Sequence, residues 1–314
     1  MPNRNVNVIF MGSPDFAVPT LDSLVQAPEF DIIRVVTQPD RPKGRGRKLS
    51  PTPVKERAIA NGIPVLTMTK RDYNAVANEL TALDPDFVVV AAFGVILKND
   101  ILDLPKHGCV NLHASLLPKY RGVSPVQTAI MAGDEETGCT TMLMDAGIDT
   151  GDILLTKRIR IDPEDTTGSL EAKLSELGAP LVVKTLRGLL DGTIGPKRQN
   201  DDLASYTKKI RKEHGLVDWS KSAEEIARQV RAMRPWPTAY TSFSDKRLII
   251  LGGCPSDVSI ARAEPGTVVS LSPFVIATGG GTLEVTRVKV EGKKEVPAQA
   301  FVSGYRVSVG DRLG

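Results

Sequence analysis

The chain has 314 residues, 41% hydrophobic and 25% charged, which is ordinary for a globular protein and long enough for two domains. No apolar run could span a bilayer and the first residues lack a signal-peptide pattern, so we expect a cytoplasmic protein with no membrane partner. The three cysteines, Cys109, Cys139 and Cys254, lack CxxC spacing, which argues against a disulfide framework or a thiolate zinc site.

The net charge of +3 is too small to indicate a nucleic-acid partner by itself, but it is unevenly distributed. Residues 206–314 hold 17 Lys and Arg against 11 Asp and Glu, whereas residues 1–205 hold 23 basic and 26 acidic side chains. A basic C-terminal part behind a slightly acidic N-terminal part indicates a polyanionic ligand.

Strand and helix patterns alternate in the first half of the chain. The β-prone apolar runs are Val6–Met11, Ile32–Thr37, Phe87–Ala92 and Cys109–Leu112. The candidate helices between them cover residues 16–26, 53–61, 72–82 and 98–103. This alternation predicts parallel strands joined by right-handed crossovers, a doubly wound, Rossmann-like α/β sheet.

The next part of the chain is predicted to hold a helix over about 124–132 and two strands, Thr140–Met144 and Ile153–Ile161. Leucines at 170, 174, 177, 181 and 189 then follow helical spacing, but Gly178 and Pro180 interrupt it. We therefore predict two short helices, the second with Pro180 near its first turn.

The polar segment 192–206 contains Gly-Pro and Gln-Asn-Asp-Asp and is predicted to be a linker. It would join an N-terminal domain, residues 1–191, to a C-terminal domain, residues 207–314. In the latter, Ser222-Ala-Glu-Glu225 is a capping-box pattern that opens a helix, and Pro235 ends it. The apolar side of this helix would consist of Ile226, Val230 and Met233.

Short β-prone runs dominate the rest of the chain. They are Leu248–Leu251, Thr267–Leu271, Phe274–Thr278 and Leu283–Val290. Because Gly and Pro separate them, we predict a small C-terminal β-barrel, similar to oligonucleotide-binding domains.

The stretch NLHASLLPKYRG, residues 111–122, begins with two polar side chains at the end of an apolar strand. Asn111 and His113 point to the same face of the strand, at the end where open α/β sheets bind ligands. The Gly-rich turn MDAGIDTGDILL between the next two strands supplies Asp145, Asp149 and Asp152. An amide, an imidazole and a carboxylate suit acyl-type transfer to an amine, with donors for a developing oxyanion.

The residues alone leave other interpretations open. An Asn beside a His at a strand end is often a local hydrogen-bonded feature, and the Asp-rich turn could mimic a calcium loop, although its spacing misses the EF-hand pattern. Three histidines without HxxxH spacing argue against a His-rich metal site, so we expect no metal. Gly12-Ser-Pro-Asp15 lacks the GxGxxG pattern of a dinucleotide dehydrogenase.

The run RPKGRGRK, residues 41–48, combines five basic residues with two glycines and no acid. Such a run is commonly a solvated surface segment. It follows the second strand, however, at the edge where the site is predicted, and arginines separated by glycine can reach phosphates. The candidate phosphate contacts are Arg41, Lys43, Arg45, Arg47 and Lys48, with Lys208, Lys209, Arg211 and Lys212 as a second patch.

NLHASLLPKYRG followed by MDAGIDTGDILL resembles the signature of the folate-dependent formyltransferases. GSPDFAVPTLDSL, QPDRPKGRGRKLSPTPVK, AAFGVIL and RPWPTAY extend the likeness over nearly the whole chain. The basic loop and the second domain resemble the tRNA-directed members. The resemblance implies formyl transfer from 10-formyltetrahydrofolate to the α-amino group of methionine on initiator tRNA, which supports translation initiation. We expect a monomer.

Residue by residue, the resemblance implies that Asn111, His113 and Asp149 are the catalytic trio. It also implies that Arg45 matters most among the basic residues of the loop, near the end of the tRNA acceptor stem. The part of the folate pocket that it implies is Ser115, Leu116, Leu117 and Pro118. For the two leucines, a packing role is the alternative.

Two further functions stay open. A formyltransferase acting on a small amine, such as glycinamide ribonucleotide or an amino-sugar nucleotide, would keep the trio without needing the arginines of residues 41–48. A catalytically silent RNA-binding protein would use the basic barrel and leave His113 with a structural role.

Overall fold

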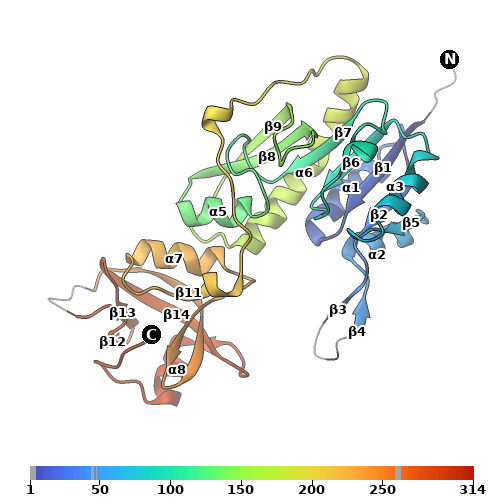
Figure 1. The fold of residues 1–314 in the computed structure, drawn as a ribbon. Coiled ribbons are helices and arrows are strands. Elements are labelled where there is room, and N and C mark those ends of the chain that lie inside the picture. The colour runs from blue at the N-terminus through green and yellow to red at the C-terminus, as the bar shows by residue number, and fades with distance from the viewer. Residues whose placement is uncertain (1–4, 44–45, 47, 259–262) are drawn as a thin grey trace. The chain divides into compact units, whose positions relative to one another are not determined.

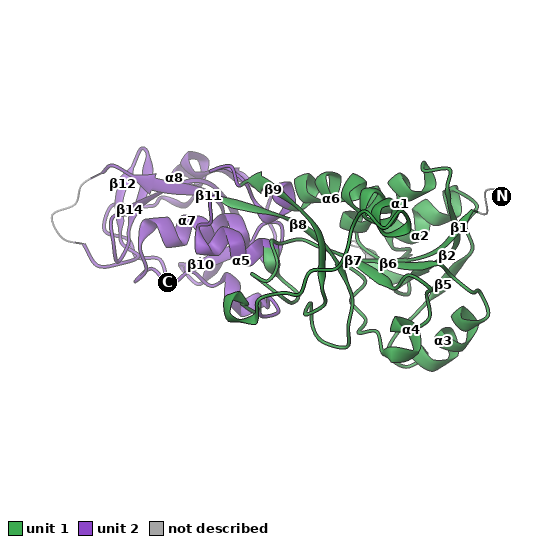
Figure 2. Ribbon diagram, turned by 90° about the horizontal axis from the view of Figure 1, so that it is seen from above, with its two compact units in different colours: residues 1–125, 136–160, 171–207 green, residues 126–135, 161–170, 208–314 purple. Residues whose placement is uncertain are grey.

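The structure is a computed structural model that describes residues 5–43, 46, 48–258 and 263–314. The chain divides into two compact units, which Figure 2 colours separately. Unit 1 comprises residues 1–125, 136–160 and 171–207, and unit 2 comprises residues 126–135, 161–170 and 208–314. The two short segments 126–135 and 161–170 therefore cluster with the C-terminal part.

Unit 1 is built on a seven-stranded sheet with the order β5-β2-β1-β6-β7-β8-β9 (Figure 1). The strands are β1 (Val6–Gly12), β2 (Phe30–Thr37), β5 (Val65–Thr67), β6 (Phe87–Ala91), β7 (Cys109–His113), β8 (Glu136–Leu143) and β9 (Ile153–Arg160). The first five strands in this order pair in parallel, whereas β8 and β9 are antiparallel. The predicted Rossmann-like α/β sheet is confirmed, with an antiparallel extension on one edge.

Helices connect the strands and close the core of unit 1. In unit 1 they are η1 (Asp15–Ala17), α1 (Val18–Val25), α2 (Pro53–Ala60), α3 (Tyr73–Thr81) and α4 (Asn99–Leu102), whereas α5 (Pro125–Ala132), between β7 and β8 in the chain, belongs to unit 2 from Val126 on. On one face of the sheet, Ile9, Val88 and Val90 pack with Val76 of α3 and Ile101 of α4. Full burial of each such side chain contributes roughly 1.5–3 kcal/mol of stability.

The leucine-rich segment forms one continuous helix, α6 (Thr167–Leu190), with Pro180 inside it. The prediction of two short helices was wrong. Proline removes one backbone hydrogen bond, but the apolar side chains on both sides of it, Leu174 and Leu186 among them, are fully buried. Packing along the whole apolar stripe therefore outweighs the local break.

Gly178, the second supposed interruption, has a tertiary role. A Cβ atom at this position would lie 2.7 Å from the side chain of Leu112 on β7. Because such contacts are shorter than real Cβ atoms tolerate, only glycine lets α6 approach the sheet this closely.

Unit 2 contains an antiparallel sheet with the order β10-β11-β14-β13-β12, and β15 pairs with β14. Its strands are β10 (Ala239–Phe243), β11 (Lys246–Ser256), β12 (Val268–Leu271), β13 (Phe274–Ala277), β14 (Thr282–Val290) and β15 (Val296–Pro297). The helices in its C-terminal part are α7 (Ala223–Ala232) and α8 (Ala298–Tyr305). Two short helical turns precede α7 in the chain. The first, η2 (Asp201–Leu203), lies in unit 1, and the second, η3 (Lys212–Gly215), lies in unit 2. The four predicted runs correspond to β11–β14, whereas β10 and α8 were not predicted.

The capping box predicted for α7 is confirmed. The Ser222 hydroxyl accepts a hydrogen bond from the Glu225 amide at 3.2 Å, and the Glu225 carboxylate accepts one from the Ser222 amide at 3.0 Å. These bonds lower the pKa of Glu225. Ile226 and Val230 of this helix lie in the core of unit 2.

The cysteines are all free thiols. Cys109 and Cys139 are buried, and burial raises the pKa of each to about 12, so both stay protonated near neutral pH. Cys254 is exposed.

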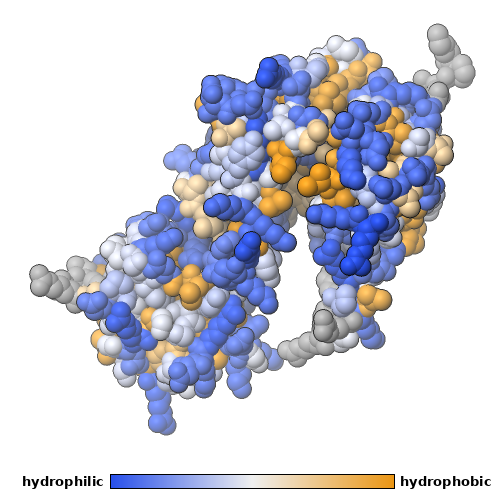
Figure 3. Space-filling view, in the orientation of Figure 1, coloured by the Kyte–Doolittle hydropathy of each residue, from blue (hydrophilic) through white to orange (hydrophobic). Residues whose placement is uncertain are grey.

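None of the helices in the described part of the chain combines the length and apolar character that a membrane span requires. Hydrophilic residues cover most of the face seen in Figure 3, and apolar residues form small groups on it. The exposed apolar side chains include Val123, Ile148, Leu203 and Tyr206.

The packing of Gly178 gives a testable prediction. In an open helix position, Gly→Ala stabilises by up to about 1 kcal/mol. Gly304 in α8 has no heavy atom within 4 Å of a Cβ, so Gly304→Ala is the matched control that should gain stability. Gly178→Ala should gain none, and Gly178→Val should cost about 1–3 kcal/mol by overpacking. Thermal unfolding of the variants measures these effects. A rise in melting temperature for Gly178→Val would contradict the close contact.

Candidate active site

The two faces of β7 have different roles. Leu112 packs against Gly178 of α6 on one face. Because side chains alternate along a strand, Asn111 and His113 point to the opposite face. Both are almost fully buried, with exposed fractions of 8% and 6%. The packing of α6 against the sheet thus determines the direction of the two polar side chains.

The ring of His113 lies between two protein groups. Its Nε2 atom lies 2.9 Å from the carbonyl oxygen of Tyr120, and since a carbonyl only accepts, Nε2 is the donor. Its Nδ1 atom lies 3.6 Å from Oδ2 of Asp149, longer than a hydrogen bond. Nδ1 is therefore the ring nitrogen that can serve a substrate atom near the carboxylate.

Asp149 is held from both its side chain and its backbone. Oδ2 accepts a hydrogen bond from the Gly122 amide at 2.7 Å, and the carbonyl oxygen accepts one from Nε2 of Gln199 at 2.8 Å. The backbone has a φ of +53°, in the left-handed region. This conformation costs a typical residue about 1–2 kcal/mol, although Asp tolerates it better than most. The surrounding bonds stabilise it.

The other two acids of this turn have different places. Asp145 is exposed, and its Oδ1 accepts hydrogen bonds from the Gly147 amide and the Thr150 hydroxyl, so it shapes the turn itself. The backbone carbonyl of Asp152 accepts from the Leu143 amide as β9 begins. Among the three acids predicted from the sequence, the structure brings Asp149 to His113.

The segment from Ser115 to Pro118 follows directly after β7. The Ser115 hydroxyl is buried and donates to the carbonyl of Lys119 at 2.6 Å, and the Leu117 side chain is buried. Leu116 and Pro118 are partly exposed. Leu116 packs on Gly138 of β8, where a Cβ would lie 2.6 Å from it. Within this segment, Leu116 and Pro118 are the apolar side chains that remain accessible.

The basic run is in part an antiparallel hairpin rather than a loop. β3 (Arg41–Lys43) pairs with β4 (Lys48–Ser50), and Lys43 is opposite Lys48. Arg41 donates to the Gln38 side chain, and Lys48 is exposed. Arg45 and Arg47 lie outside the described residues. The hairpin follows the carboxyl end of β2, the sheet edge at which β7 also ends.

Sequence reasoning missed Arg121 and Gln199. Arg121 is only 1% exposed, and its guanidinium donates to Gln199, to Asp201 and to the Tyr206 hydroxyl. Burial alone would lower the pKa of Arg121, but the hydrogen bonds to Asp201 and Tyr206 raise it. Arg121 lies inside the polar stretch that ends in KYRG, but nothing local indicates that its partners lie about 80 residues later.

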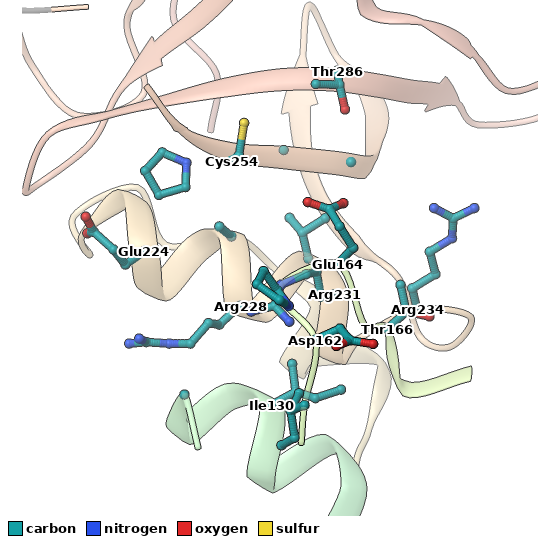
Figure 4. A pocket seen from close by; sticks show the side chains of 18 of the residues that line it. Ile130, Asp162, Glu164, Thr166, Glu224, Arg228, Arg231, Arg234, Cys254 and Thr286 are labelled. Carbon is teal, nitrogen blue, oxygen red and sulfur yellow. The ribbon is translucent and has the colours of Figure 1, made fainter. Parts of the chain in front are cut away.

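The described residues contain no group of three or more His, Cys, Asp or Glu side chains that could hold a metal ion. Unit 2 has a separate cavity of about 660 Å³, shown in Figure 4. Its basic side chains are Arg228, Arg231, Arg234 and Arg287, and its acidic side chains are Asp134, Glu135, Asp162, Glu164 and Glu224. The pKa of Arg231 is lowered, and burial is the main cause. This cavity contains none of the site residues predicted from the sequence.

A buried amide and imidazole, with a carboxylate 3.6 Å from the ring, lie together at one face of the α/β sheet. Two family models match the chain, "Formyl transferase" over residues 4–186 and "Formyl transferase, C-terminal domain" over residues 209–306. The chain belongs to the formyl transferase family.

Curated relatives match the chain over almost its full length. The methionyl-tRNA formyltransferase of Lachnospira eligens is 44% identical over 98% of this chain and 100% of its own. The enzyme of the same name from Geobacter metallireducens is 44% identical over 98% and 99%, and that from Moorella thermoacetica 45% identical over 98% and 99%.

Solved structures share the fold at low identity. The sugar 3N-formyl transferase WlaRD has a TM-score of 0.67 at 21% identity, covering 93% of this chain and 100% of that one. HypX from Aquifex aeolicus, in complex with tetrahydrofolic acid, has a TM-score of 0.66 at 16% identity, covering 98% of this chain and 49% of that one.

Proposed function

We propose that this protein transfers a formyl group from 10-formyltetrahydrofolate to the α-amino group of methionine on initiator tRNA. The observation that carries the proposal is the full-length identity of 44–45% to enzymes named methionyl-tRNA formyltransferase. The basic C-terminal part, with 17 basic and 11 acidic residues in 206–314, favours a polyanionic substrate. The product would serve translation initiation.

The amine is a competent nucleophile without strong activation. An α-amino group has a pKa of roughly 7.7–8, so an appreciable fraction is neutral near pH 7. The donor supplies an activated formyl carbon. The amine forms the new C–N bond to this carbon, the C–N bond to the folate nitrogen breaks, and the proton lost by the amine is balanced by one gained at the leaving nitrogen.

The residues of β7 would stabilise the charge that develops on the formyl oxygen. The Asn111 side-chain amide supplies a neutral donor. In the imidazolium form both ring nitrogens of His113 carry hydrogen, so the ring, whose Nε2 already donates to the Tyr120 carbonyl, supplies a second donor through Nδ1. Asp149, 3.6 Å from that nitrogen, orients the ring and accepts the proton of the attacking amine. Their burial excludes water and strengthens each of these interactions.

The donor pocket would include Ser115, Leu116, Leu117 and Pro118. In support of this, Leu116 and Pro118 are the accessible apolar side chains that follow the catalytic strand and suit a flat pterin ring. Ser115 and Leu117 would act by holding the segment in shape, since both are buried. Two structural neighbours are described with tetrahydrofolic acid or folinic acid bound.

The direct test is a formylation assay. The protein is mixed with 10-formyltetrahydrofolate and methionine-charged initiator tRNA, and formyl-methionine is measured after deacylation. A parallel reaction offers glycinamide ribonucleotide as a small amine. We expect product with the charged tRNA alone. Product with the small amine alone, or with neither acceptor, would refute the proposal.

The proposed oxyanion donors give a second prediction. Loss of such a donor typically lowers kcat about 10²–10³-fold. Asn111→Ala and His113→Ala should therefore lower kcat roughly a hundredfold or more, with little change in tRNA affinity. Asn74→Ala, at an exposed position on α3, is the matched control and should keep full activity. Near-normal turnover of purified Asn111→Ala would exclude its role.

The basic hairpin gives a third prediction. We propose that Arg45 contacts the acceptor stem and that Arg41, Lys43, Arg47 and Lys48 add less specific phosphate contacts. Each lost phosphate contact reduces the slope of log K against log salt by roughly 0.7–0.9. Arg45→Ala should show this reduction and weaker selection of initiator over elongator tRNA. Arg71→Ala, at an exposed position, serves as the control. An unchanged slope and unchanged selection in Arg45→Ala would rule out this contact.

A further inference from the structure

The side-chain amide of Gln199 is fully hydrogen-bonded around the turn that contains Asp149. Its Nε2 atom donates to the carbonyl oxygens of Asp149 at 2.8 Å and Gly151 at 2.7 Å. Its Oε1 atom accepts from Nη2 and Nε of Arg121 at 2.9 and 3.1 Å. Two donors and one oxygen with two lone pairs are the whole capacity of an amide, and all are used.

Arg121 determines the orientation of this amide. A guanidinium can only donate, so the end of the Gln199 side chain that faces it must be the oxygen. The nitrogen is thereby directed to the two carbonyls of the turn. Arg121 is itself fixed by Asp201 at 2.8 Å and by the Tyr206 hydroxyl at 3.0 Å.

The same part of the chain also holds the other side of the site. The Arg121 amide donates to the carbonyl of Ser205 at 2.8 Å, and the Thr207 amide donates to the carbonyl of Arg121 at 2.7 Å. The residue before Arg121 supplies the carbonyl that accepts from His113, and the residue after it supplies the amide that binds Asp149. The segment 199–207 therefore holds the backbone of Arg121, the residue between the two backbone groups that bind His113 and Asp149.

The segment has this effect without adding a reactive group. Gln199 is 5% exposed, and each of its bonds goes to protein atoms. The hydrogen bond from Gln199 reaches the backbone of residue 149, which has a left-handed conformation that surrounding bonds must enforce. A small displacement of this turn would move the carboxylate away from Nδ1 of His113, and misplacement by about 1 Å can cost on the order of a hundredfold in rate.

We propose that Gln199, oriented by Arg121, is a positioning residue that holds Asp149 in its catalytic place. This inference rests on the proposed function, because it assigns to Gln199 an effect exerted through Asp149. The segment that leads to unit 2 is thus part of the catalytic apparatus of unit 1.

The test is a double-mutant cycle on formyl transfer. Gln199→Met keeps the volume of the side chain and removes all four hydrogen bonds, and Gln199→Glu keeps the acceptor for Arg121 but loses both donors. Each should lower kcat about tenfold or more while the KM for tRNA changes less than about twofold. Gln299→Met is the matched control, because it makes the same change at an exposed position on α8 of unit 2. Circular dichroism and thermal unfolding check that each variant is folded.

The second background is Asp149→Asn, which keeps the shape of the side chain. In this background, Gln199→Met should change kcat by no more than about twofold, because the group through which Gln199 acts is already lost. If Gln199→Met lowers kcat by the same factor in both backgrounds, or if folded Gln199→Glu keeps normal turnover, the inference is overturned while the proposed function stands. Normal turnover of Asp149→Asn would instead remove the catalytic role of Asp149, and the inference with it.

Discussion

The Oδ2 atom of Asp149 is the point on which the geometry of the site depends. It accepts from the Gly122 amide at 2.7 Å and faces Nδ1 of His113 at 3.6 Å. The three residues come from the β8–β9 turn, the loop after β7 and β7 itself. The carboxylate of Asp149 is partly buried. It needs such partners, since an unpaired charge removed from water is strongly unfavourable.

The sheet supplies the rigid side of this arrangement. β7 lies between β6 and β8, and Leu112 contacts Gly178 of α6 on the face away from the site. Side chains of a strand alternate between the two faces of its sheet. Because one face of β7 is packed against α6, only the side chains on the other face are available to a ligand. The other side of the site consists of loops, and these are held by the hydrogen bonds of Arg121 and Gln199.

The fold does not by itself decide the acceptor of the formyl group. Structural neighbours with TM-scores of 0.67 and 0.53 are described as a sugar 3N-formyl transferase and a glycinamide ribonucleotide transformylase. A shared α/β fold accommodates different acceptors through the elements added to it. In this chain the elements outside the α/β sheet include the basic hairpin β3–β4 and the antiparallel sheet domain of unit 2. Their charge, rather than the sheet, favours a nucleic acid.

Local sequence patterns correctly predicted the structural features that depend on a few neighbouring residues. The strand that ends in Asn111 and His113, the α/β alternation and the Ser222–Glu225 capping box all follow from periodicity or spacing over a few residues. Local patterns gave the wrong prediction where tertiary packing determines the secondary structure. Pro180 and Gly178 are helix breakers in isolation, but they lie inside α6 because the buried leucines and the contact with Leu112 outweigh them.

The sequence by itself determined the fold class, the strand that carries Asn111 and His113, and the family resemblance, because each is encoded in residues close together in the chain. The residues alone left three acids of the turn open, and the resemblance implied Asp149. Only the tertiary structure decided that Asp149 lies 3.6 Å from His113 and that Arg121 and Gln199, separated by 78 positions, hold it there. Hydrogen bonds between distant residues leave no periodic signal in a single sequence. They form when the packed sheet brings their segments together and a buried polar group must find a partner.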